Sequence, residues 1–165
     1  MIILGIDPGV ARLGYGVLET RHDRILASCH GCLETDKATP HGDRLLEVRD
    51  RLRELIAKYK PELVAVEKLF FETNARTAIV VGEARGVVML TAAEAKLPVV
   101  EMTPLQVKQT VTGSGSADKK QVQKMIQVLL NLKEVPKPDD AADALAIAIC
   151  GMRYAASASR LAAKS

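Results

Sequence analysis

Four carboxylates of this 165-residue chain stand where an α/β fold could bring them together. Asp7 ends the apolar run at the start of the chain, and Glu67 ends a second, shorter apolar run. Asp140 and Asp143 are three residues apart, so on a helix they project from one face. Carboxylate oxygens are the ligands that Mg²⁺ prefers, and two such ions about 3.5–4 Å apart support phosphodiester hydrolysis. The pattern therefore predicts a two-metal hydrolytic site.

Each carboxylate also has a structural interpretation. Asp7 precedes Pro-Gly and is typical of a turn cap, and Glu67 is typical of a strand end that reaches water. Asp139 and Asp140 open a helix, where acids stabilise by capping and by the helix dipole, about 0.3–1 kcal/mol each, so at least one is expected to be structural. Asp143 is different, because the residues that follow it are all apolar. A carboxylate in that position requires a cation.

Hydrophobic periodicity predicts the elements that would position these groups. Strands are expected at residues 1–6, 14–18, 25–35, 63–66 and 98–102. Helices are expected at residues 40–59, 74–96, 104–110 and 118–132, and from about residue 139 onward. Three successive strands followed by alternating helices and strands predict an α/β fold. We expect a mixed five-stranded sheet, a three-strand antiparallel meander plus two parallel strands, flanked by helices.

Length and composition predict one soluble domain. A chain with 48% hydrophobic residues and this length buries one core, which we place at residues 1–154, with a frayed tail of small and polar residues at 155–165. The sequence has no uninterrupted apolar run of about eighteen residues and no signal-peptide pattern, which favours a cytoplasmic protein without a membrane span. Cys29 and Cys32 lie in a predicted strand and face opposite sides, so neither a metal site nor a disulfide is expected between them.

Positive charge is concentrated in one segment. The net charge of +3 is too small to indicate nucleic-acid binding, but residues 103–137 hold six lysines and two acids. Lys119 and Lys120 follow a Gly-Ser loop at a predicted helix start, which attracts phosphate, whereas Lys124 and Lys133 are typical of a solvated helix face. The first pair is the better candidate for phosphate binding.

Two further features indicate contacts with other molecules. The helix at 74–96 is apolar nearly all round, and Gly82 and Gly86 would let another backbone approach. This pattern fits packing against a second subunit, and it fits a central helix in a monomer equally well. Phe70 and Phe71 cannot both turn into one core, so one of them is expected to stack on an unpaired base, with packing at a dimer contact as the alternative for Phe71.

The chain resembles the RuvC family of bacterial Holliday-junction resolvases over nearly its whole length. The resemblance rests on five motifs in order, namely LGIDPG at 4–9 with GYGV at 14–17, VE at 66–67 followed by Phe70, ARGV at 84–87, QVKQTV at 106–111, and DAADALAIA at 140–148. The resemblance implies a ribonuclease H-like fold, a homodimer, and symmetric paired nicks in a four-way DNA junction. It also implies a role in recombination and repair beside the RuvAB branch-migration complex.

The family's functional positions fall on specific residues of this chain. Its four metal-binding and catalytic carboxylates match Asp7, Glu67, Asp140 and Asp143, which implies two Mg²⁺ per site, with Mn²⁺ as a substitute. Basic positions near the scissile phosphate and the junction backbone match Lys108 and Lys119. The other candidates for DNA contacts are Lys120, Phe70, Phe71, Asn74 and Arg76. Among these, the resemblance assigns base stacking to Phe70.

Other interpretations are weaker. Sugar kinases, actin and heat-shock ATPases share a Gly-Ile-Asp-x-Gly loop, but they need a second glycine-rich phosphate loop and a much longer chain. The only later glycine cluster, at residues 113–115, does not follow an acidic strand end. A non-catalytic junction-binding module would be favoured by loss of a carboxylate, and none is lost. A related nuclease acting on RNA or on another branched DNA is the closer alternative.

Overall fold

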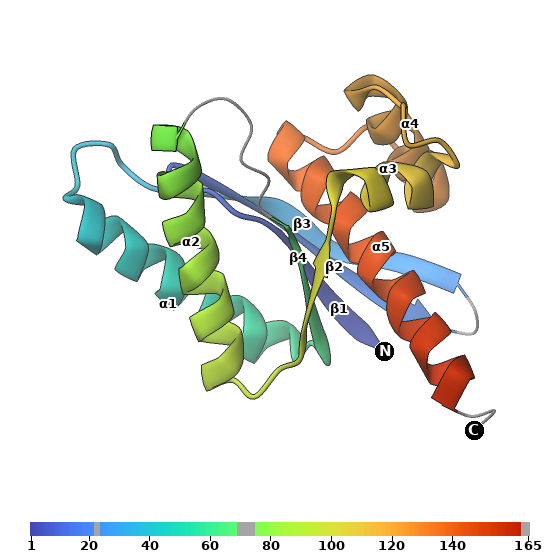
Figure 1. Ribbon diagram of the computed structural model, residues 1–165, viewed down its shortest axis with the longest axis horizontal. Coiled ribbons are helices and arrows are strands. Elements are labelled where there is room, and N and C mark those ends of the chain that lie inside the picture. Colours follow the sequence, from blue (N-terminus) through green and yellow to red (C-terminus); the bar gives the residue numbers. More distant parts are fainter. Residues whose placement is uncertain (22–23, 69–74, 163–165) are drawn as a thin grey trace.

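A mixed five-stranded sheet with helices on both faces forms the structure, a computed structural model that describes residues 1–21, 24–68 and 75–162 (Figure 1). The strands are β1 (Ile2–Asp7), β2 (Arg12–Arg21), β3 (Arg24–Glu34), β4 (Leu63–Glu67) and β5 (Val99–Met102). The helices are α1 (His41–Tyr59), α2 (Ala75–Glu94), α3 (Pro104–Thr112), α4 (Lys119–Leu129) and α5 (Asp139–Ala162). The expected elements are all present, with bounds shifted by a few residues.

The strand order is β3-β2-β1-β4-β5. The first three strands form the predicted antiparallel meander, β4 pairs in parallel with β1, and β5 pairs in parallel with β4. In the register of β1 with β4, Ile6 is opposite Val66, so Asp7 and Glu67 lie side by side where their strands end. The predicted fold class is thereby confirmed.

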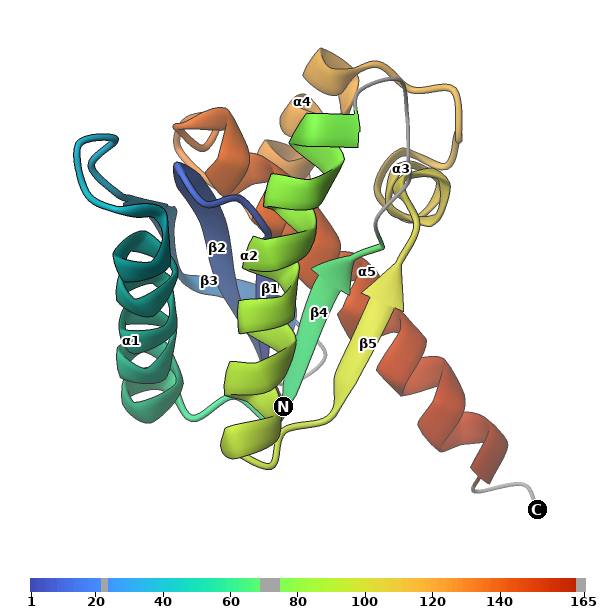
Figure 2. The same cartoon turned by 60° about the vertical axis from the view of Figure 1, so that its left-hand side comes forward.

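Helices cover the two faces of the sheet differently. Helices α1 and α2 lie on one face, and α5 crosses the other face in contact with all five strands (Figures 1 and 2). Two apolar clusters fill the spaces between these layers. Alternate residues of β1 serve them in turn, since Ile3 belongs to the α5 side, and Leu4 and Ile6 to the side of α1 and α2. Asp7 therefore points to the α5 side, like Ile3.

Three glycines allow α5 to lie directly on the sheet. A Cβ added to Gly5 would collide with backbone atoms of Ala144 and Ala148, and one on Gly16 would meet Leu145 at 2.8 Å. At Gly14 the added Cβ would collide with the carbonyl of Asp140. Because Gly14 is paired with Asp7 in the antiparallel register, this close approach brings the start of α5 to the end of β1.

Gly14→Ala is expected to destabilise the fold by about 3 kcal/mol, because the obstacle to the new Cβ is backbone, which cannot rotate away. The matched control is Gly42→Ala on α1, where an added Cβ meets nothing within 4 Å and helix propensity favours alanine by about 0.5 kcal/mol. Urea denaturation of both variants measures the difference. Equal stabilities would contradict the close packing of α5 on β2.

The C-terminal segment differs from the prediction. A frayed tail was expected from Ala155, whereas α5 continues through Ala162. Alanine dominates this segment and is the strongest helix former, so it extends a helix already nucleated by its buried first half. None of the helices within the described residues combines the length and apolarity needed to cross a bilayer.

The close cysteine pair lies in a strand, as predicted. Cys29 and Cys32 both lie in β3, and neither is in a disulfide. The Cys29 thiol is 4.0 Å from the Tyr15 hydroxyl, and the Cys32 thiol donates to the carbonyl of Leu33 at 3.7 Å. These contacts are local and structural.

Candidate active site

A cavity of about 220 Å³ opens where β1 and β4 end beside α3, α4 and α5. Its polar lining consists of Asp7, Glu67, Asp143, Lys108 and Lys119, above apolar side chains of the three helices. Three of the four predicted carboxylates therefore share one cavity with two of the predicted lysines. Two features of the topology bring these residues together. The crossover through α1 places β4 parallel to β1, and α5 packs across the sheet.

Asp7 lies among neighbouring carboxylates at this cavity. Burial, followed by the neighbouring carboxylates Asp143, Glu67 and Asp140, raises the pKa of the Asp7 carboxyl from 3.8 to about 7. Lys119 opposes this shift without cancelling it. Asp7 thus lies in a field that disfavours its ionised form unless a further cation is present.

Glu67 and Asp143 experience the same field. Burial, followed by the charge of Asp143, raises the pKa of Glu67, while Lys108 lowers it. Burial also raises the pKa of Asp143, against the hydrogen bond from Lys119. The three carboxylates share too little positive charge in the protein itself, which is the condition in which carboxylates bind a divalent ion.

Asp140 and Asp139 occupy different surroundings. The Asp140 side chain is 29% exposed, and one of its carboxylate oxygens forms an ion pair with the guanidinium of Arg12 at 3.1 Å. The Asp139 side chain is 63% exposed, and hydrogen bonds from Lys119 and Gln123 lower its pKa. Asp140 does not line the cavity, but its charge acts on both Asp7 and Asp143. Asp139 instead ties the start of α5 to α4.

Lys119 is placed by a capping box. The side chain of Asp118 accepts from the amide of Gln121, and the Gln121 side chain accepts from the amide of Asp118, so α4 begins at Lys119. Its ammonium lies 3.2 Å from an oxygen of Asp139 and 3.2 Å from an oxygen of Asp143. Burial would lower the pKa of Lys119, but these two contacts more than offset that effect and raise it.

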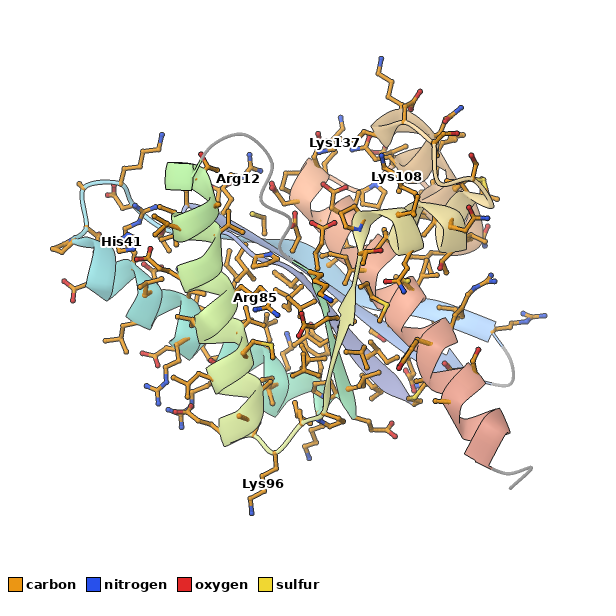
Figure 3. All side chains as sticks on the ribbon, viewed as in Figure 1. Arg12, His41, Arg85, Lys96, Lys108 and Lys137 are labelled. Carbon is orange, nitrogen blue, oxygen red and sulfur yellow. The ribbon has the colours of Figure 1, made fainter. Side chains whose placement is uncertain are left out.

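The remaining predicted basic and aromatic residues divide into three groups. Lys108 on α3 lines the cavity and makes no ion pair in the part of the chain that the structure describes (Figure 3). Lys120 is exposed at the start of α4 and does not line the cavity. The predictions for Phe70, Phe71 and Asn74, and for the side chain of Arg76, fall outside the described residues.

Sequence reasoning missed Arg12, which contacts Asp140 and also lies 3.5 Å from Glu34 on the neighbouring strand β3. The sequence offered only part of the signal: Arg12 precedes Gly14 by two residues on one strand, so both face the same side of the sheet. The close approach of α5 at Gly14 is evident only from the structure.

The four predicted carboxylates do not surround a single point in this structure. Among residues 1–21, 24–68 and 75–162, no three His, Cys, Asp or Glu side chains are arranged as a bound metal ion would require. The donor chemistry nevertheless fits a hard divalent cation, because the groups are carboxylates whose pKa values are raised by burial and then by their neighbouring carboxylates.

A five-stranded mixed sheet in this order, with an acidic site at the ends of its central strands, defines a ribonuclease H-like α/β protein. Residues 3–151 match the family described as crossover junction endodeoxyribonuclease RuvC. The chain belongs to this family of DNA endonucleases.

Similar proteins cover almost the whole chain. The crossover junction endodeoxyribonuclease RuvC of Desulforamulus reducens is 52% identical over 154 residues, which are 93% of this chain and 94% of that protein. The structure of Thermus thermophilus RuvC superimposes with a TM-score of 0.87 at 38% identity, over 96% of this chain and 97% of the other. The structure of T. thermophilus RuvC in complex with a Holliday junction substrate also superimposes with a TM-score of 0.87. The two are 35% identical, over 95% of this chain and 96% of the other.

Proposed function

We propose that this protein is a structure-selective endonuclease that resolves four-way DNA junctions by paired symmetric nicks, in recombination and repair. The observation that carries the proposal is the convergence of Asp7, Glu67 and Asp143 in one cavity on a resolvase-family fold. Support for the substrate comes from the T. thermophilus relative, which has been solved in complex with a Holliday junction.

The site is proposed to be metal-dependent, with Asp7, Glu67, Asp140 and Asp143 as ligands. Two Mg²⁺ ions, or Mn²⁺ in their place, would supply an activated water and neutralise charge on the phosphate, leaving 5′-phosphate and 3′-hydroxyl ends. The residues of the chain have distinct parts. Asp7 supplies the carboxylate whose pKa is raised to about 7, chiefly by burial, while Glu67 and Asp143 flank it from β4 and α5.

Basic residues around the cavity are proposed to hold the DNA backbone. Lys108 and Lys119 line it from α3 and α4, where an ammonium group binds phosphate without taking a metal-binding position. Lys120 is exposed beside the same helix start and would contact phosphate farther along the strand. Phe70, Phe71, Asn74 and Arg76 remain predicted DNA contacts in the segment between β4 and α2.

A homodimer is proposed through α2. Ala84, Val88 and Ala92 bury one side of this helix, while Ile79 and Leu90 are 63% and 56% exposed on its outer side. Gly86 lies on that side with no atom near its missing Cβ, so another backbone could approach. Two copies would present two sites to one junction, as symmetric nicking requires, and sedimentation of monomers alone at micromolar concentration would contradict this. Cooperation with the RuvAB complex is part of the same proposal.

Selective cutting is the test of the proposed function. With Mg²⁺ present, a synthetic four-way junction should be nicked on two opposing strands, whereas a linear duplex of the same sequence should stay intact under the same conditions. The measurement is gel analysis of strands labelled one at a time, together with ligation of the product nicks. Equal cutting of both substrates would exclude a structure-selective enzyme, and preferential cutting of RNA would favour the closer alternative.

A further inference from the structure

Two cations of the protein itself already occupy the carboxylates of α5. The Arg12 guanidinium lies 3.1 Å from Asp140, and the Lys119 ammonium lies 3.2 Å from Asp143. Asp143 lines the cavity with Asp7 and Glu67, whereas Asp140 does not, and no three acidic side chains in the described parts of the chain are arranged as a bound metal ion would require. Both ion pairs therefore involve carboxylates that the proposed metal site would use.

We propose that Arg12 is a positioning residue of the metal site, and that Arg12 and Lys119 are internal counterions which divalent metal must displace and which are thereby released to bind DNA phosphate. The inference rests on the proposed function. It adds an exchange of cations, in which metal binding at the carboxylates and phosphate binding at the released side chains assist each other.

The backbone geometry explains why Arg12 can control the orientation of Asp140. Gly14 fixes the main chain of Asp140 against β2, and Arg12 is on the same side of the same strand. With its main chain held, Asp140 can change only by side-chain rotation, toward Arg12 or toward Asp7. A guanidinium that keeps its charge at all working pH values holds the first orientation until a stronger cation competes.

Arg12 and Lys119 are exposed enough to leave Asp140 and Asp143 without being buried elsewhere. Arg12 is half exposed, at 47%, and already lies 3.5 Å from Glu34, so it loses no solvation on leaving Asp140. The Lys119 side chain is 54% exposed and retains Asp139 at 3.2 Å. Figure 3 shows Arg12 and Lys108 in the upper half of the view, on either side of the start of α5. A backbone phosphate at the start of α5 would meet Lys108 at all times, and Arg12 and Lys119 once the metal has displaced them from Asp140 and Asp143.

By thermodynamic linkage, metal and DNA should each raise the affinity for the other by the same factor. If the cations served structure alone, their removal would weaken metal binding or leave it unchanged. If they are displaced counterions, their removal should strengthen it, because the metal then meets carboxylates without competitors. The two roles therefore predict opposite signs.

The test is a titration of the DNA-free protein with Mn²⁺, with free Mn²⁺ followed by electron paramagnetic resonance. Arg12→Met and Lys119→Met are each expected to bind Mn²⁺ about five- to tenfold more tightly than the unmodified protein, as expected for loss of one charge-assisted contact. Matched controls are Arg21→Met, at the other end of β2 and paired with Glu19, and Lys124→Met on the solvated face of α4. Both controls should bind Mn²⁺ like the unmodified protein.

A second readout follows the released cations. Junction affinity should rise when Ca²⁺ replaces EDTA, and the rise should be several-fold smaller in Arg12→Met, because one phosphate-binding cation is missing. Unchanged or weaker Mn²⁺ binding in both variants would overturn the inference. If the protein cuts junctions with metal but the two variants bind Mn²⁺ with unchanged affinity, the proposed function stands and the exchange of cations does not. Tighter Mn²⁺ binding by the variants of a protein that does not cut junctions would support the exchange of cations and contradict the proposed function.

Discussion

Asp7→Asn is expected to lower the rate of junction cleavage by about 10³-fold while leaving the fold intact. Asparagine has the shape of aspartate but lacks the charge that a divalent ion requires. Stabilisation by metal contributes several kcal/mol to a hydrolytic transition state, and each 1.36 kcal/mol is about tenfold in rate. The rate should be measured in single turnover at saturating protein, so that binding does not limit it.

Junction binding by the same variant should be retained, because Asp7 lies in the cavity among carboxylates that repel phosphate. Electrophoretic mobility shift in EDTA measures this. The control is Asp50→Asn on α1, an exposed acid whose ion pair in the described part of the chain is with its neighbour Arg49, and it should cut at the unmodified rate. Undiminished cutting by Asp7→Asn would place the chemistry elsewhere.

The stability of the metal-free protein should fall as pH rises from 5 to 8, relative to that of Asp7→Asn. The folded protein holds the Asp7 proton up to about pH 7, whereas the unfolded chain releases it near 3.8. Since the pKa is higher in the folded state, the favourable contribution is fully present below pH 3.8 and is lost as pH passes through 7. Glu67 and Asp143 shift in the same direction.

The variant cannot ionise at this position, so its stability advantage should grow by about 2–3 kcal/mol between pH 5 and pH 8. Urea denaturation in EDTA at several pH values measures the change. Mg²⁺ at pH 8 should stabilise the unmodified protein more than the variant, because it binds the folded carboxylates. An advantage that is equal at pH 5 and pH 8 would show that Asp7 ionises normally in the folded protein.

Much of the fold could be predicted because its elements differ clearly in periodicity. Buried runs such as β1 and β4 are short and continuously apolar, and α1 has one apolar stripe. The proximity of Asp7 to Glu67 followed once the two strands were assumed to be neighbours. The register that places Ile6 opposite Val66 could not be predicted, since it depends on packing across the whole sheet.

Finer features of the site depend on long-range contacts. A shift of one residue in the start of α5 would exchange the environments of Asp139 and Asp140, and no local pattern decides between them. The close approach at Gly14 fixes that start and brings Arg12 to Asp140 from a distant part of the chain. The helical segment after Ala155 was missed for a local reason, the propensity of alanine.

The central claim is that Asp7, Glu67, Asp140 and Asp143 form one metal site. The most direct measurement is anomalous X-ray diffraction from crystals of the protein soaked with Mn²⁺, which locates the ion independently of any activity. We predict anomalous density in direct contact with Asp7 and with at least one of the other three carboxylates, and its loss in Asp7→Asn. Mn²⁺ bound only away from Asp7, in a protein that cuts junctions in its presence, would contradict the account.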